Sequence, residues 1–306
     1  MRPYGAFYTE DYKTVNRPKR GKFAPGAKLQ MLTSTSLRRT AVLSLMTICA
    51  TFGPTSSATD LYGTNHSVLH GITRTATGTS QASSLPAGVS VPSYAVAITN
   101  VQALPGWKIC VGSCAGGKTP TSYKMTQHVA SASRNNDGLG TTFSESGVTF
   151  GDVMWYVSLG NSSAKNFVMD FWMKIDKPQN VQALEYAILK RDSSYWYKGS
   201  TQCNYISGAL RGYNVSTRSW QSLGANCMKA TAGTWQHVTI QYSISSGKTA
   251  FQKANFGSLL QTMTASLPRQ SESTTSSSMG VHFQLDNANT TSGYTVSVDN
   301  WTVYSW

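Results

Sequence analysis

Short runs of alternating apolar and polar residues fill the chain from Tyr94 to its end. Turn residues (Gly, Asn and Ser) separate these runs, and no helical period of any length lies between them. Many short strands with such turns are typical of a sandwich or a barrel, so we predict an all-β fold. The predicted strands are Tyr94–Val101, Ser122–Gln127, Thr141–Ser144, Val153–Ser158, Phe167–Ile175, Val181–Leu189, Tyr195–Lys198, Gln202–Ser207, Leu210–Tyr213, Trp235–Ser243, Thr249–Lys253, Leu259–Met263, Gly280–Asp286 and Tyr294–Tyr304.

The last run, residues 294–306, predicts a strand that is buried on one face. Val296 and Val298 alternate there with polar neighbours, which is the pattern of a half-buried strand. If the strand is regular, Val298 and Trp301 point to opposite faces. Two alternatives follow: Trp301 stacks outward, or a bulge near Asn300 turns it toward the core.

Counting by two along four long strands separates a core face from a second, polar face. If the four strands were neighbours in one sheet, the second face would form a polar platform with aromatic rings. Such a platform suits saccharides, because amides and carboxylates pair with hydroxyls and an indole stacks on the C–H face of a pyranose. The alternative is an ordinary solvated outer face, which is also expected to be polar. The predicted core face is Phe167, Met169, Phe171, Met173, Ile175, Leu184, Tyr186, Ile188, Val238, Ile240, Tyr242, Val281, Phe283 and Leu285, and the second face is Asp170, Trp172, Lys174, Glu185, Trp235, His237, Gln241, His282, Gln284 and Asp286.

Two segments resemble a known superfamily. The segment GTWQHVTIQY, residues 233–242, resembles the "W-x-H-V" strand of the concanavalin A-like lectin/glucanase superfamily, including its laminin-G-like members. The terminal VDNWTVY, residues 298–304, is similar to the closing strand of the same group. The resemblance implies a jelly-roll β-sandwich of two curved antiparallel sheets, often with carbohydrate on the concave sheet or the rim loops. The "NG" hairpin usual after the first motif is absent, and Asn255-Phe256-Gly257 stands in its place.

The region before the predicted sandwich has the features of an export signal. Arg38-Arg39 precede an apolar run over residues 41–52, and a site of small residues follows. This order is typical of a secretory signal peptide, and the run is shorter than the roughly 20 apolar residues of a membrane span. We therefore expect a secreted protein, extracellular or periplasmic, with no membrane span. The predicted segments are a disordered upstream extension (1–30), a signal peptide (31–58), a linker or loosely attached entry segment (59–92) and the sandwich (93–306).

Four cysteines follow the predicted signal, and an even number in an exported chain indicates two disulfides. Three pairings are possible, and we favour Cys110–Cys114 with Cys203–Cys227. A zinc site is disfavoured, because the spacing lacks a tight second pair and the compartment is oxidising. We expect no cofactor; the nearest match to a calcium loop is the stretch 286–289, DNAN.

A second concentration of aromatic residues lies around the segment between Cys203 and Cys227. Rings held on a disulfide-bonded excursion, with arginines among them, predict a rim on which sugar rings stack. The alternative is that these rings shield an edge of the sandwich. The residues are Tyr195, Trp196, Tyr197, Tyr205, Tyr213 and Trp220, with Arg211 and Arg218; adding the polar platform, the predicted ligand-binding residues are Asp170, Trp172, Glu185, His237, Gln284, Trp196, Arg211 and Trp220.

The charge of the chain narrows the choice of partner. The formal net charge is +13, but residues 1–58 hold 9 of the 26 Lys and Arg and only 2 of the 13 Asp and Glu. No basic run remains in the predicted sandwich, so we do not expect nucleic acid as a partner. We expect carbohydrate or polysaccharide as the partner. We also expect a monomer.

These features favour a secreted, non-catalytic, lectin-like carbohydrate-binding protein. A first alternative is a polysaccharide hydrolase or lyase that uses Asp170, Glu185, His237 and His282. Glucanases of the superfamily that this chain resembles carry a compact E-x-D-x-x-E strand, but residues 185–190 read EYAILK and lack its second and third carboxylates. A second alternative is a structural or adhesion domain.

Overall fold

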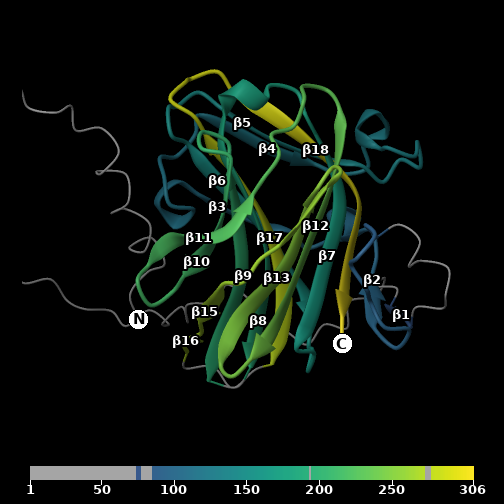
Figure 1. The fold of residues 1–306 in the computed structure, drawn as a ribbon. Helices are drawn as coiled ribbons and strands as arrows, with labels where there is room; N and C mark the ends of the chain where they lie inside the picture. The colour runs from purple at the N-terminus through teal and green to yellow at the C-terminus, as the bar shows by residue number, and fades with distance from the viewer. Residues whose placement is uncertain (1–73, 77–84, 193, 273–276) are drawn as a thin grey trace, which may run out of the picture. The chain divides into compact units, whose positions relative to one another are not determined.

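The computed structural model describes residues 74–76, 85–192, 194–272 and 277–306, which fold as a sandwich of two antiparallel sheets (Figure 1). The predicted all-β, two-sheet antiparallel sandwich is confirmed. The predicted upstream extension and signal peptide, and most of the expected entry segment, lie outside the described residues. No helix among the described residues has the length and apolar character that crossing a membrane requires.

The larger sheet, named here the β7 sheet, has ten described strands. Strands β15 and β5 pair with β13 and β18, and β4 pairs with β5. The order along its main path is β1 (Arg74–Ala76), β2 (Val96–Ile98), β18 (Tyr294–Ser305), β7 (Asn166–Ile175), β12 (Trp235–Ser245), β13 (Lys248–Phe256) and β14 (Leu259–Thr262), and the side strands are β15 (Ser266–Pro268), β5 (Thr141–Ser146) and β4 (Ser122–Thr126).

The second sheet, named the β8 sheet, has eight described strands, and β16 pairs with β9. The order along its main path is β11 (Ser219–Asn226), β10 (Ala209–Asn214), β9 (Tyr195–Asn204), β8 (Val181–Asp192), β17 (Ser278–Asn287), β6 (Asp152–Gly160) and β3 (Lys108–Val111), and the side strand is β16 (Gln270–Ser271).

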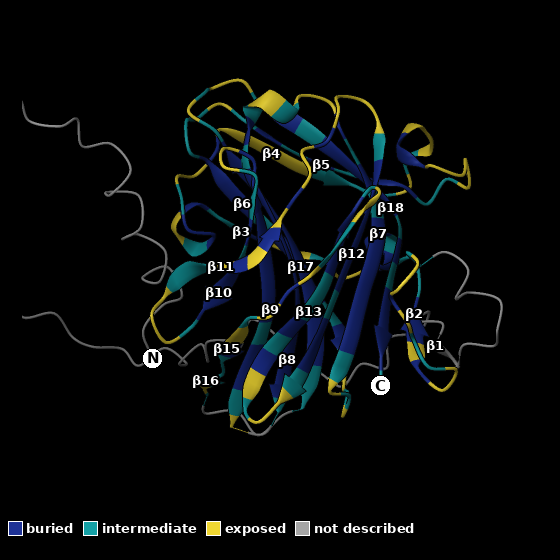
Figure 2. Cartoon of the chain, viewed as in Figure 1, coloured by how far each residue is buried: buried dark blue, intermediate teal, exposed yellow. Residues whose placement is uncertain are grey.

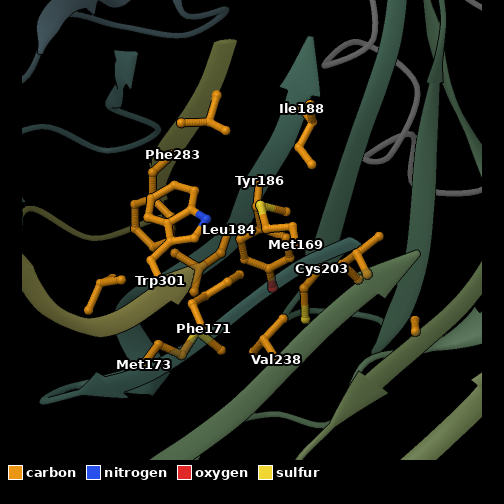
Figure 3. Close-up of a cluster of buried hydrophobic side chains, with 14 of the residues drawn as sticks. Met169, Phe171, Met173, Leu184, Tyr186, Ile188, Cys203, Val238, Phe283 and Trp301 are labelled. Atoms are coloured by element: carbon orange, nitrogen blue, oxygen red, sulfur yellow. The ribbon is translucent and has the colours of Figure 1, made fainter. Parts of the chain in front are cut away.

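Apolar side chains from both sheets meet in one core between them. The core faces predicted for β7, β8, β12 and β17 are buried at every position, which confirms the period-two assignment. Figure 3 shows Phe171 of β7, Tyr186 of β8, Phe283 of β17 and Trp301 of β18 in this cluster. Burying a large apolar side chain contributes roughly 1.5–3 kcal/mol, so the inner faces fix which side of each strand is left for function.

A bulge in β18 turns Trp301 into the core. The pairing of β18 with β7 shifts between Asp299 and Thr302, and Asn300 has a left-handed backbone with φ 53°. Gln102 supports the bulge: its Oε1 accepts from the Trp301 backbone N–H at 3.0 Å, and its Nε2 donates to Asp299 Oδ1 at 3.3 Å. Trp301 is 0% exposed, so the inward alternative holds.

The two disulfides are Cys110–Cys114 and Cys203–Cys227, the pairs favoured from the sequence. Cys203 lies near the end of β9 and Cys227 follows β11, so their disulfide brackets β10 and β11. Closing a loop of 24 residues stabilises the fold by about 3 kcal/mol in the chain-entropy model.

Part of the expected entry segment packs on the sandwich. Val89 joins Ala97, Val168 and Tyr304 in a small apolar cluster on the side of the β7 sheet that faces away from the main core. Figure 2 shows that the long strands are largely buried, whereas the exposed residues gather in the connecting loops.

Candidate functional site

The predicted polar platform is divided between the two sheets. Strands β7 and β12 are neighbours in the β7 sheet, and β8 and β17 are neighbours in the β8 sheet. Because the alternate residues of all four strands fill the common core, their polar residues point away from it on opposite sides of the sandwich. Three of the eight predicted ligand-binding residues (Asp170, Trp172 and His237) therefore lie on the outer face of the β7 sheet, and five (Glu185, Gln284, Trp196, Arg211 and Trp220) lie on the outer face of the β8 sheet.

The residues considered for catalysis are divided in the same way. Asp170 and His237 lie on the β7 sheet, whereas Glu185 and His282 lie on the β8 sheet. The structure does not bring Asp170 and Glu185 together, because strand pairing puts them on different layers. The four residues cannot form one active site, which corrects the set given as the hydrolase or lyase alternative.

On the outer face of the β7 sheet, Asp170 is the centre of a closed polar network. His237 Nε2 lies 2.9 Å from Asp170 Oδ1, and Thr239 Oγ1 donates to the same oxygen at 2.5 Å. All three residues are buried. A buried carboxylate with hydrogen-bond partners on the next strand fastens β7 to β12.

Trp172, on the same face, has a group on each side of its indole ring. This is because its partner on β12 is His237 and its partner on β18 is Asp299, and Asp299 accepts from the Arg134 backbone N–H. The His237 ring stacks on one side at 4.5 Å between centroids, with 2° between the ring planes. The Arg134 guanidinium lies 3.8 Å from the centre of the Trp172 ring. Because a parallel stack and a cation over the ring each take one face of an indole, Trp172 offers no open face to a sugar.

The centre of the β8 outer face is a buried network of carboxyl and amide groups. Gln202 Nε2 donates to Glu185 Oε1 at 3.0 Å. Gln284 Nε2 donates to Asp286 Oδ1 at 2.8 Å and to the Ala115 carbonyl at 3.0 Å. The second bond ties the loop that follows the Cys110–Cys114 disulfide to this face.

Burial raises the pKa of the carboxyl groups at and near this face. The pKa of Asp286 rises to about 7 and that of Glu145, on β5, to about 10; the nearby Asp286 carboxyl adds to the Glu145 shift. Burial, and then repulsion from Asp286, also raises the pKa values of Asp152 and Glu185 well above the ordinary range of carboxyl groups. At pH 7 Glu145, Asp152 and Glu185 are therefore held largely neutral in the folded protein, whereas Asp286 is about half protonated.

The pKa values of two basic groups on the same face are lowered rather than raised. Burial lowers the pKa of His282 to about 3, with a further contribution from the Lys198 charge. Burial lowers the pKa of Lys198 to about 8, against the field of Glu272. At pH 7 Lys198 is thus still largely protonated and His282 is neutral.

Toward β11 the face carries a group of aromatic and basic side chains from three neighbouring strands. Lys198 Nζ lies 4.0 Å from the centre of the Trp196 ring and 5.4 Å from that of Tyr213. The Tyr213 ring meets Trp220 edge to face at 5.3 Å, and Tyr213 is opposite Trp220 in the strand register. We name Trp196, Lys198, Arg211, Tyr213 and Trp220 the Trp220 cluster.

Exposure within the Trp220 cluster differs between its members. Trp196 and Tyr213 are buried, whereas Lys198, Arg211 and Trp220 are half-buried. The cluster is therefore an aromatic floor with two cations and one indole that reach the surface. This combination can stack on a ring and bind polar or anionic groups beside it.

Sequence reasoning missed Lys198 and did not select Tyr213 as a binding residue. Counting by two along the whole of β9 places Lys198 on the face of Trp196 and Gln202, but that strand was predicted as two separate runs. The other aromatic residues of the stretch lie elsewhere: Tyr205 is buried in the core, and Tyr197 Oη accepts from Arg269 Nη1 at 3.0 Å.

The described residues contain no group of three His, Cys, Asp or Glu side chains arranged to hold a metal ion. In the stretch considered for calcium, Asp286 accepts from Gln284 as given above, and Asn287 Nδ2 donates to the carbonyls of Val148 and Thr290. Asn287 Oδ1, the side-chain oxygen, is buried without a hydrogen-bond partner among the described residues.

No family model matches the chain, and no curated protein matches it. Solved structures with similar folds include arcelin-5, a lectin-like defence protein from Phaseolus vulgaris, at 11% identity and a TM-score of 0.40, covering 69% of this chain and 98% of that one. Carbohydrate-binding modules of the β-sandwich superfamily follow at 9% identity and 0.35, covering 65% and 57%. A sialidase is similar at 10% identity and 0.34, covering 64% of this chain and 16% of its own.

Proposed function

We propose that this protein is a secreted, non-catalytic carbohydrate-binding protein whose binding surface is the outer face of the β8 sheet at the Trp220 cluster. One observation carries the proposal. Three neighbouring strands place an indole, a phenol and two cations on one face, and the indole and both cations reach the surface.

The chemistry of the cluster matches what a sugar ring requires. The C–H face of a pyranose stacks on an indole or phenol ring, and its hydroxyls take hydrogen bonds from guanidinium and ammonium groups. Trp220 supplies the ring, which meets Tyr213 in a T-shaped contact. Arg211 and Lys198 supply the donors.

The proposal assigns no catalytic step to the buried carboxyl groups. Glycoside hydrolysis by a pair of carboxyl groups needs two such groups that flank the substrate. Glu185 and Asp286 are the adjacent pair on this face, but both are almost wholly buried beside the loop that contains Ala115. We assign them to holding that loop and the neighbouring strands together.

Secretion and membership of the concanavalin A-like superfamily remain part of the proposal. Two disulfides favour an oxidising compartment, and the segment 233–242 forms much of β12, in the middle of the β7 sheet.

The test is a glycan array read with the purified protein, together with a reducing-end assay on each polysaccharide that binds. The expected result is binding to a defined set of glycans without release of new reducing ends. Release of reducing ends would replace the binding function with a hydrolase, and new unsaturated products absorbing near 235 nm would indicate a lyase. An array with no binding above background would overturn the proposal and favour a structural or adhesion role.

A further inference from the structure

The cations of the Trp220 cluster lack carboxylate partners. Among the described residues, the structure gives Arg211 and Lys198 no hydrogen bond or ion pair. Lys198 is contacted by the Trp196 and Tyr213 rings but by no anion in the described part of the chain. A half-buried cation without an anionic partner can take one from a ligand.

Two carboxyl groups lie near these cations by strand register or by their field, and both are already engaged. In the strand register, Gln202 stands between Glu185 and Arg211, and its amide is bonded to Glu185. Glu272, whose field reaches Lys198, is paired with Arg191 at 2.9 Å. Neither carboxyl group is therefore placed to neutralise Arg211 or Lys198.

The protonation of buried carboxyl groups on the face also leaves these cations without compensating negative charge. Glu185, Asp152 and Asp286 have raised pKa values, so at neutral pH they offset the cations less than three ionised carboxylates would. The face therefore presents positive charge beside an aromatic ring.

We propose that the Trp220 cluster selects anionic saccharides: Trp220 stacks on a sugar ring while Arg211 and Lys198 bind a carboxylate or sulfate group of the same chain. This inference rests on the proposed carbohydrate-binding function and adds the class of ligand. A carboxylate of a uronic acid and a sulfate ester share the geometry that a guanidinium recognises with two parallel N–H donors.

The test is calorimetric titration of the full protein with three probes of equal length. These are hexagalacturonate, a sulfated galactan hexasaccharide without uronic acid, and neutral β-1,4-galactohexaose. We expect at least one anionic probe to bind at least tenfold more tightly than the neutral one. The stronger of the two anionic probes identifies the group as carboxylate or sulfate.

Four variants test the residues. R211Q and K198Q should each weaken binding of the preferred anionic probe about tenfold. K198R keeps the charge and should retain most of the affinity. K124Q removes an exposed lysine from β4, which belongs to the other sheet, and is the control, with less than a twofold change expected. Melting temperatures close to the parent protein show that each variant is folded.

Three outcomes overturn the inference. If the neutral probe binds as tightly as the anionic ones and R211Q and K198Q bind unchanged, the anionic selectivity is wrong while the carbohydrate-binding function stands. If K124Q weakens binding as much as R211Q does, the attraction is a general surface charge. If none of the three probes binds and the glycan array is blank, both proposals fail.

Discussion

The two outer faces of the sandwich carry the same kinds of residue and use them differently. On the β7 face, Trp172 is enclosed between Arg134 and His237, and Asp170 is bonded to its neighbours on β12. On the β8 face, Trp220 is half-buried and meets Tyr213 in a T-shaped contact, and Arg211 has no anionic partner among the described residues. Aromatic and charged side chains are thus occupied by protein groups on the β7 face and available to a ligand on the β8 face.

The difference shows that composition alone does not identify a binding face. A tryptophan, a carboxylate and a cation stabilise the fold when they satisfy one another, and they are available for a ligand when they do not. What distinguishes the two faces is the number of ring sides and hydrogen-bonding atoms that the protein itself already occupies. Four experiments can sharpen or break this distinction, beginning with the largest expected effect.

The largest effect should come from pH, because carboxyl groups at and near the β8 face have raised pKa values. In the unfolded chain these groups ionise near pH 4, whereas folded Asp286 and Glu145 keep their protons until about pH 7 and about pH 10. Unfolding therefore releases protons, and the free energy of unfolding falls as pH rises. Between pH 6.5 and 8 His282 and Lys198 oppose the trend only in part, since the lowered pKa of His282 acts mainly below pH 6.5 and that of Lys198 mainly above pH 8.

Urea denaturation at pH 6.5, 7 and 8 measures this trend. E145Q stays neutral at every pH and should show a smaller decrease than the parent, and D176N, at an exposed position, should match the parent. A free energy of unfolding that stays level or increases over this interval would show that the carboxyl groups are not held neutral.

The next largest effect should come from D170A on the β7 face. The substitution leaves His237 and Thr239 buried without their common acceptor, and we expect a loss of about 3 kcal/mol in the free energy of unfolding. Urea denaturation at pH 7 measures the loss, and D170N, which keeps the shape and one acceptor oxygen, should lose less. Glycan affinity of the folded variant should stay within twofold of the parent; a change in affinity without a change in stability would move the binding site to the β7 face.

A pair of tryptophan variants compares the faces directly. W220A should weaken binding of the best glycan on the array at least tenfold, which is about 1.4 kcal/mol, with little change in melting temperature. W172A should lower the melting temperature and leave the affinity within twofold, because its ring is occupied on both sides. Calorimetry and a thermal melt on both proteins measure the two quantities. The opposite assignment of effects would reverse the roles given to the two faces.

The smallest effect should come from R134A. Its guanidinium is exposed and lies over Trp172, and a cation in such a position contributes roughly 0.5–1 kcal/mol. The backbone N–H of residue 134 still donates to Asp299 Oδ2, at 2.6 Å in the parent, so the loop should keep its attachment. Urea denaturation against K124A, which removes an exposed lysine from β4, measures the difference. A loss equal to that of K124A would mean that the contact contributes nothing.

The inner faces of the strands could be predicted from the sequence because they depend only on local alternation. Phe171, Tyr186, Val238 and Phe283 follow the period of two, and all four are buried in the core. The fold class follows from the same pattern, repeated along the chain.

The assignment of each strand to a sheet could not be predicted in that way. The neighbours of β7 are β12 and β18, and the neighbours of β8 are β9 and β17, so several of the decisive pairings join strands far apart in the sequence. Local alternation carries no information on such pairings. For this reason Asp170 and Glu185, close in the sequence, were considered together but lie on opposite faces. The contact of the Arg134 guanidinium with the Trp172 ring could not be predicted either, since Arg134 comes from a distant loop.

The bulge in β18 has a consequence for recognising related chains. Before Asn300 the inward residues have even numbers, as at Val296 and Val298; after it they have odd numbers, as at Trp301 and Val303. The inward/outward alternation of the strand therefore shifts by one residue at Asn300. A comparison that forces one continuous alternation through this strand will place half of it on the wrong face. A sequence profile built from relatives should treat the two halves of the strand as separate segments joined by a one-residue gap.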